Sequence, residues 1–127
     1  MTKIFAHRGA SAYAPENTME AFELAAKQGA EGIELDVHVT KDGEVVVTHD
    51  EKIDRVSNGS GFIKDMTLRE LKRLSFHNHM ESYVGAGIPT LREVLEYVST
   101  TNMDVNIELK TVIYWYPQIE EKTAFIV

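Results

Sequence analysis

GIELDVHV, the stretch of residues 32–39, alternates strictly between apolar and polar side chains from Ile33 onward. One face carries Ile33, Leu35, Val37 and Val39, and the other carries Glu34, Asp36 and His38. A period of two predicts a β-strand whose apolar face packs against a core. Alternate Cα atoms of a strand are about 6.6 Å apart, so the polar face brings two carboxylates side by side.

A second strand is expected to return beside the first. The segment 41–44, Lys-Asp-Gly-Glu, contains the Asp-Gly pair typical of a tight turn, and a β-branched run follows it and ends at His49. Counting back from the turn pairs Val37 with Thr48 and Asp36 with His49. The pattern therefore predicts that His49 lies opposite Asp36.

A β-α unit precedes this pair. The apolar run of residues 3–6 predicts a strand, and His7 follows it directly. Asn17 and Glu20 have the spacing of a capping box, which predicts a helix that begins there and ends at Gly29.

The second half of the chain is more irregular before the pattern resumes. Residues 51–87 are rich in polar loop residues and are interpreted as a small insertion after the second strand region. Capping boxes at residues 67–70 and 90–93 predict two further helices, and alternation over residues 104–110 predicts another strand.

Composition limits the classes of protein that this chain can belong to. It has 127 residues, no Cys, and 13 Lys and Arg against 20 Asp and Glu, a net charge of −7. The length suits one domain, and the lack of Cys excludes disulfides and thiolate chemistry. The acidic balance argues against nucleic acid as a partner, and the absence of a long apolar run against a transmembrane segment. A cytoplasmic location is expected.

The acidic residues of two strands form a candidate metal site. Glu34 and Asp36 share a strand face, and Glu108 lies on the polar face of the predicted strand at residues 104–110. Carboxylates that are buried together repel unless a divalent cation or nearby basic residues balance them. The alternative is an acidic face that simply meets water.

Two histidines stand where strands end and reactive groups are often placed. His7 and His49 could act together as general acid and general base, because the pKa of His is near neutrality. Each could instead be an ordinary loop histidine. His38 lies beyond the acidic pair, and His77 and His79 are expected to be solvated in a polar loop.

Arg8 and Lys110 are the cations adjacent to these strand ends. A guanidinium and an ammonium both suit a phosphate group, although both side chains could simply be solvated. Carboxylates, histidines and cations together favour metal-assisted phosphoryl or phosphodiester chemistry.

Six short motifs then resemble one family in their order and spacing. They are His7-Arg8-Gly9, Glu16-Asn17-Thr18, Glu34-Leu35-Asp36, His49-Asp50, Ile88-Pro89-Thr90-Leu91 and Asn106-Ile107-Glu108-Leu109-Lys110. They resemble the N-terminal half of the glycerophosphodiester phosphodiesterases, and the match extends to about Lys110.

The resemblance implies a fold and a set of site residues. The fold would be α/β, the N-terminal portion of a TIM-type (β/α) barrel over residues 1–127, with the insertion at residues 51–87. The residues would comprise Glu34, Asp36 and Glu108 for one divalent cation, Ca²⁺ or Mg²⁺, His7 and His49 for acid-base catalysis, and Arg8 and Lys110 for the phosphate.

The reaction implied by the resemblance is hydrolysis of a small-molecule glycerophosphodiester to glycerol 3-phosphate and an alcohol. One histidine would deprotonate the glycerol 2-hydroxyl, the other would protonate the leaving alcohol, and water would open the resulting cyclic phosphate. A phospholipase that acts on lipid phosphodiester headgroups is the alternative within the same chemistry. A truncated half-barrel that binds only a metal or a partner is the alternative outside it.

Length raises one further expectation. A closed (β/α)₈ barrel takes typically about 250 residues, so this chain suffices for only half of one. Half a barrel has open sheet edges, and we therefore expect self-association through them.

Overall fold

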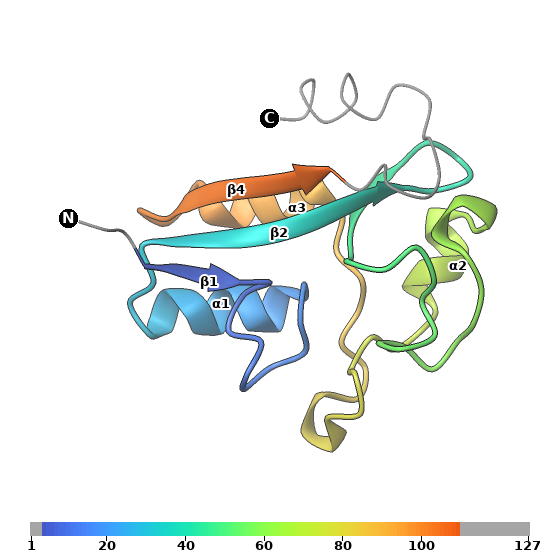
Figure 1. Cartoon of the computed structure of the whole chain (residues 1–127), viewed down its shortest axis with the longest axis horizontal. Helices are drawn as coiled ribbons and strands as arrows, with labels where there is room; N and C mark the ends of the chain where they lie inside the picture. The colour runs from blue at the N-terminus through green and yellow to red at the C-terminus, as the bar shows by residue number, and fades with distance from the viewer. Residues whose placement is uncertain (1–3, 110–127) are drawn as a thin grey trace.

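The computed structural model describes residues 4–109, which form a four-stranded sheet with helices packed on it (Figure 1). The elements in chain order are β1 (Phe5–His7), α1 (Met19–Lys27), β2 (Gly32–Val39), β3 (Val45–Val47), the 3₁₀ turn η1 (Ile63–Asp65), α2 (Leu68–Lys72), the 3₁₀ turn η2 (Glu81–Tyr83), α3 (Leu91–Val98) and β4 (Asp104–Leu109). None of the helices within residues 4–109 is long and apolar enough to cross a membrane.

Strand β2 is the centre of the sheet, as its alternation predicts. Strands β1 and β4 pair with it in parallel, and β3 pairs with it antiparallel. The parallel register sets His7 beside Glu34 on one side and Glu108 beside Asp36 on the other. Candidate site residues of three strands are thus neighbours through backbone pairing alone.

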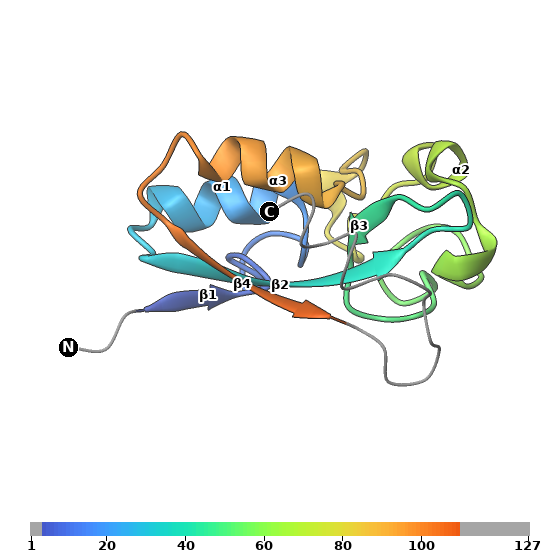
Figure 2. The same ribbon diagram turned by 90° about the horizontal axis from the view of Figure 1, so that it is seen from above.

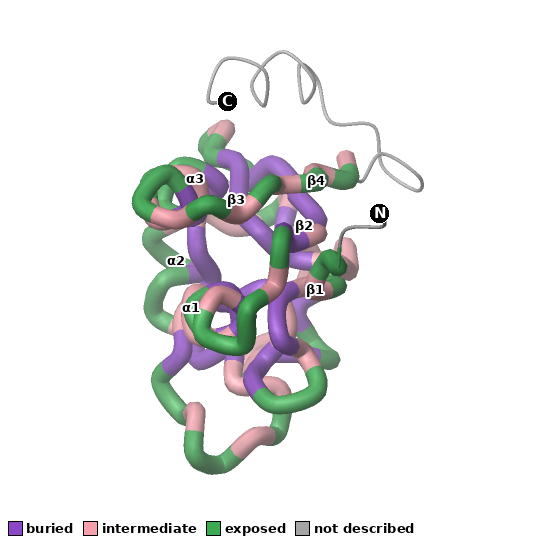
Figure 3. Tube along the Cα trace, turned by 90° about the vertical axis from the view of Figure 1, so that its left-hand side faces the viewer, coloured by how far each residue is buried: buried purple, intermediate pink, exposed green. Residues whose placement is uncertain are grey.

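Helices α1 and α3 lie on the same face of the sheet (Figure 2). The apolar face of β2 packs under them, and Ile33, Leu35 and Val37 are completely buried in this core. Figure 3 shows β2 as buried, whereas β4 alternates between exposed and half-buried residues. Apolar side chains therefore face the helices, and the acidic side chains occupy the opposite face.

The register of the β2–β3 hairpin differs from the sequence prediction by one residue. Val37 pairs with Val47, so His49 is not opposite Asp36. The amide of Gly43 donates to the carbonyl of Thr40 at 3.0 Å, and Gly43 has a φ of 85°. The loop is therefore a three-residue turn with a left-handed glycine, and its extra residue shifts the pairing by one position.

The start of α1 also differs from the prediction. Thr18 is the cap, since its hydroxyl accepts a hydrogen bond from the amide of Ala21 at 3.2 Å. Asn17 has a φ of 56°, and its side chain is used elsewhere. The loop before it passes so close to α1 that a Cβ on Gly9 would lie 2.8 Å from the Cβ of Ala21.

Residues 51–87 lie outside the sheet and surround a second apolar cluster, in which Ile53, Ile63 and Leu71 are fully buried. The capping boxes predicted at Thr67 and Thr90 are both confirmed at the starts of α2 and α3. That the segment is an insertion within a barrel stays a prediction.

Candidate active site

The chain segments that carry the two candidate histidines meet at one edge of β2. The amide of Arg8 donates to the carbonyl of Glu34 at 2.8 Å, and the amide of Thr48 donates to the carbonyl of Asp36 at 2.9 Å. Carbonyls two residues apart point to the same edge of a strand. The ends of β1 and β3 therefore reach the same edge beside the acidic residues, and β4 occupies the other edge.

Three carboxylates converge on the face opposite the helices. Glu34, Asp36 and Glu108 each offer an oxygen, and these oxygens all lie within 4.8 Å of one another. Glu34 and Asp36 are alternate residues of β2, and Glu108 is the register partner of Asp36. The structure thus brings together the three acids that the sequence analysis singled out.

The electrostatics of this cluster suit a hard cation. Burial raises the pKa of Glu34 and the charge of Asp36 raises it further, while His7 acts in the opposite direction. Both carboxylate oxygens of Glu34 are buried, and neither accepts a hydrogen bond from the residues that the structure describes. Ca²⁺ and Mg²⁺ prefer carboxylate oxygens, so the residues fit a divalent ion that would relieve this repulsion.

His7 is the last residue of β1 and lies beside the cluster. Its Nε2 is 3.2 Å from Oε2 of Glu34, yet its side chain is 68% exposed. The imidazole is thus held next to the candidate metal ligands and is open to a substrate.

His49 is fixed by contacts on its ring and on its backbone. Its Nδ1 lies 2.7 Å from Oδ1 of Asp50, and its carbonyl lies 2.9 Å from Nε2 of His38. Burial would raise the pKa of Asp50, but hydrogen bonds from Arg55 and His49 lower it below its usual value. Asp50 is therefore an ionised acceptor for the Nδ1–H of His49, which leaves Nε2 for chemistry.

Arg8 lies between Glu16 and the acidic cluster on the sheet. Its Nη1 donates to Glu16 at 3.2 Å, its Nε is 3.7 Å from Asp36, and its φ is 57°. A non-glycine residue in the left-handed region is strained, and strain of this kind clusters at active sites and ligand clamps. Lys110, the other predicted phosphate ligand, lies outside the described residues.

Several residues of the site were not identified from the sequence. The side-chain nitrogen Nδ2 of Asn17 donates to Oδ2 of Asp36 at 3.0 Å. The sequence instead suggested that Asn17 caps a helix. Glu16 and Arg55 form an ion pair across 39 positions of sequence. Only the Glu16-Asn17-Thr18 motif signalled their region.

The expectation for the remaining loop histidines is half right. His79 is exposed, as predicted. His77 is not simply solvated, because its Nδ1 lies 2.7 Å from the hydroxyl of Ser75, which also accepts from the amide of Gly85. Its contacts hold the loop together.

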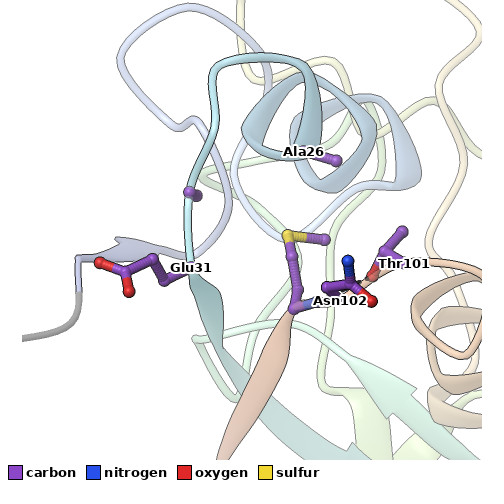
Figure 4. A pocket seen from close by; sticks show the side chains of 6 residues that line it. Ala26, Glu31, Thr101 and Asn102 are labelled. Carbon is purple, nitrogen blue, oxygen red and sulfur yellow. Dashed lines mark hydrogen bonds between the residues drawn. The ribbon is translucent and has the colours of Figure 1, made fainter.

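A separate hollow lies near the other end of β2. It has a volume of about 380 Å³ and is lined by Ala26, Ala30, Glu31, Thr101, Asn102 and Met103 (Figure 4). Glu31 precedes β2 and Met103 precedes β4, so the hollow lies at the starts of the two strands that carry the acidic cluster further along. Its lining contains a single carboxylate and no histidine or cation.

Comparison with known proteins gives a consistent match. Residues 7–124 match the glycerophosphoryl diester phosphodiesterase family. A glycerophosphodiester phosphodiesterase of Caldanaerobacter subterraneus is 52% identical over 95% of this chain, and one of Bacillus altitudinis is 55% identical over 96%. The chain spans about half the length of these relatives, 50% and 51% respectively.

Solved structures agree with the sequence match. A glycerophosphodiester phosphodiesterase from Agrobacterium tumefaciens superposes with a TM-score of 0.89 at 42% identity, over all of this chain and 52% of its own. An Oleispira antarctica phosphodiesterase in complex with the product sn-glycerol-3-phosphate has a TM-score of 0.83 at 40% identity, over 87% and 45% of the two chains. These neighbours confirm the fold as the N-terminal portion of a TIM-type barrel. The chain belongs to the glycerophosphoryl diester phosphodiesterase family.

Proposed function

We propose that this chain supplies the metal-binding and acid-base residues of an enzyme that hydrolyses glycerophosphodiesters to glycerol 3-phosphate and an alcohol. The observation that carries the proposal is the convergence of three carboxylates on the polar sheet face, with His7 beside them. The relative with bound sn-glycerol-3-phosphate supports the choice of product. A small diester is therefore the proposed substrate.

Glu34, Asp36 and Glu108 would hold one divalent cation, Ca²⁺ or Mg²⁺. Such an ion, when bound, neutralises charge on a phosphate and orients its oxygens. The pKa of Glu34 is raised first by burial and then by the charge of Asp36, and this supports the proposal because a bound cation would offset both effects.

His7 and His49 would transfer the protons of the reaction. One takes the proton of the glycerol 2-hydroxyl as that oxygen attacks phosphorus, and the bond from phosphorus to the other alcohol breaks. The second histidine gives its proton to the departing alkoxide. Water then opens the cyclic phosphate, and each histidine returns to its starting protonation state.

Arg8 would bind the phosphate, because its guanidinium lies between Glu16 and the Asp36 edge of the cluster. A cation at this place offsets the negative field that would otherwise repel a phosphodiester. The same role for Lys110 stays a prediction, as does a cytoplasmic location.

Hydrolysis of glycerophosphocholine by the intact protein tests the proposal. We expect release of glycerol 3-phosphate and choline, loss of turnover in EDTA, and recovery with excess Ca²⁺ or Mg²⁺. Turnover that is insensitive to EDTA would refute the metal site. A clear preference for lysophosphatidylcholine would indicate a phospholipase instead, and metal binding without hydrolysis of either compound would indicate a non-catalytic module.

A further inference from the structure

Arg55 connects the two loops that follow β1 and β3. Its Nη1 and Nη2 donate to the two carboxylate oxygens of Glu16 at 2.8 and 2.9 Å. Its Nε and Nη2 donate to the two oxygens of Asp50 at 2.9 and 3.2 Å. One guanidinium therefore makes paired contacts to two carboxylates, the geometry that restricts both most strongly.

The carboxylate of Asp50 acts on His49. Asp50 Oδ1 lies 2.7 Å from Nδ1 of the His49 ring, and the Asp50 side chain is 27% exposed. Burial alone does not fix so exposed a carboxylate. The contacts from Arg55 set its rotamer, and through it the plane and the tautomer of the imidazole.

The carboxylate of Glu16 acts on Arg8. The Glu16 side chain is only 9% exposed and accepts from both Arg8 and Arg55. Without Arg55, this nearly buried carboxylate would draw Arg8 as its remaining partner. The chain of contacts thus runs from Arg8 through Glu16, Arg55 and Asp50 to His49.

We propose that Arg55 is a positioning residue that orients His49 through Asp50 and Arg8 through Glu16, so that the acid-base group and the phosphate ligand share one support. The proposal rests on the proposed function, in which His49 transfers a proton. Arg55 itself need not touch the substrate. Arg55 belongs to the segment of residues 51–87, so its contacts join that segment to the loops after β1 and β3.

The test compares Arg55→Met with Lys72→Met in the intact protein. Lys72 is a matched control because it also anchors the segment of residues 51–87, donating to the carbonyl of Ile88 and to Glu93, both at 2.7 Å, without contacting His49. Nitrogen-15 NMR of the imidazole, recorded without substrate, measures the His49 tautomer. We expect the Nδ1–H form in the wild type and in Lys72→Met, and a mixture of tautomers in Arg55→Met.

Kinetics provide the second measurement. Displacement of a catalytic group by about 1 Å can cost roughly 100-fold, so we expect Arg55→Met to lower kcat by about 10-fold or more. Arg55→Ala should regain part of its kcat when guanidinium ion is added, and Lys72→Ala should not respond. This rescue separates loss of positioning from misfolding.

An unchanged His49 tautomer in a folded Arg55→Met protein would overturn the proposal. So would equal loss of kcat in Arg55→Met and Lys72→Met with no rescue by guanidinium. If the wild type hydrolyses no glycerophosphodiester, the proposed function fails, and the tautomer measurement still decides whether Arg55 orients His49.

Discussion

Asp36 of β2 and Glu108 of β4 are direct register partners in parallel strands, although they are 72 positions apart in the sequence.

 The intervening residues fold into β3, the segment of residues 51–87 and α3 before the chain returns beside β2. Backbone pairing, and not proximity in sequence, therefore assembles the acidic cluster. Substitutions there are expected to change chemistry while leaving the hydrogen bonds of the sheet in place.

The first prediction concerns the cation. Calorimetric titration of the intact protein with Ca²⁺ or Mg²⁺ should give about one site, and Glu34→Gln should abolish it, because the ligand set loses a charge that a hard cation requires. Glu44→Gln is the control, since Glu44 is an exposed carboxylate in the β2–β3 turn. Unchanged titration in Glu34→Gln would contradict the site.

The second prediction concerns the histidines. His7→Ala and His49→Ala should each lower kcat by roughly 100-fold or more, because each removes a proton-transfer group, and cation binding should be nearly unchanged. His77→Ala should leave kcat nearly unchanged, since His77 contacts Ser75 within its own loop and, within residues 4–109, contacts none of the proposed site residues. Small and equal losses in steady-state kinetics of all three variants would show that no catalytic pair exists.

The third prediction concerns two glycines with similar backbone angles. Gly9 and Gly29 have φ values of 80° and 81°, but only at Gly9 would a Cβ clash, with Ala21. Gly29→Ala should cost roughly 1 kcal/mol of unfolding free energy, and Gly9→Ala about 2 to 4 kcal/mol because overpacking is added to the backbone strain. Denaturant unfolding measures both, and equal losses would mean that the loop after β1 can move away from α1.

The fourth prediction concerns acid stability. Burial would raise the pKa of Glu93, but the Lys72 and Thr90 hydrogen bonds lower it below 4.5. Ionised Glu93 therefore stabilises the fold above pH 4.5, and this contribution is lost as the pH falls through the lower folded value.

Glu93→Gln isolates this charge, because glutamine keeps the capping-box acceptor. The Glu93 side chain is 50% exposed, so solvent screening limits the expected deficit to about 0.5 kcal/mol at pH 7. The unfolding free energies of wild type and variant should converge in acid. A deficit that persists at low pH would show that the amide disrupts the cap itself.

The fifth prediction concerns the sheet edges. Within residues 4–109, β1 and β4 each pair only with β2, which leaves one side of each strand without a partner strand. Unpaired edges associate readily, so the 127-residue chain expressed alone should self-associate or unfold easily. Light scattering that shows a stable monomer with full phosphodiesterase turnover would contradict this prediction.

The sequence predicted those parts of the fold that depend on local patterns. Alternation identified β2 and β4, and side-chain spacing identified the caps of α2 and α3, because these signals need only a few neighbouring residues. The acids Glu34, Asp36 and Glu108 were found in the same way, each as a polar residue between apolar ones.

Other features depend on distances that no local pattern encodes. The predicted hairpin register was wrong by one residue. The true register depends on the length of the turn, and the left-handed φ of Gly43 makes this a three-residue turn. Asn17 looks like a helix cap in sequence, yet its amide contacts Asp36 on another element. The contacts of Arg55 with Glu16 join distant loops and follow no periodicity.

Strand β2 places its odd-numbered residues against the helices and its even-numbered acids on the opposite face. A single-residue insertion or deletion within β2 would exchange the two sets downstream of the change, moving carboxylates into the core and valines into the site. Folding and chemistry would then fail together, even if every functional residue were still encoded. Evolution can therefore vary this strand by substitution far more easily than by a change in its length.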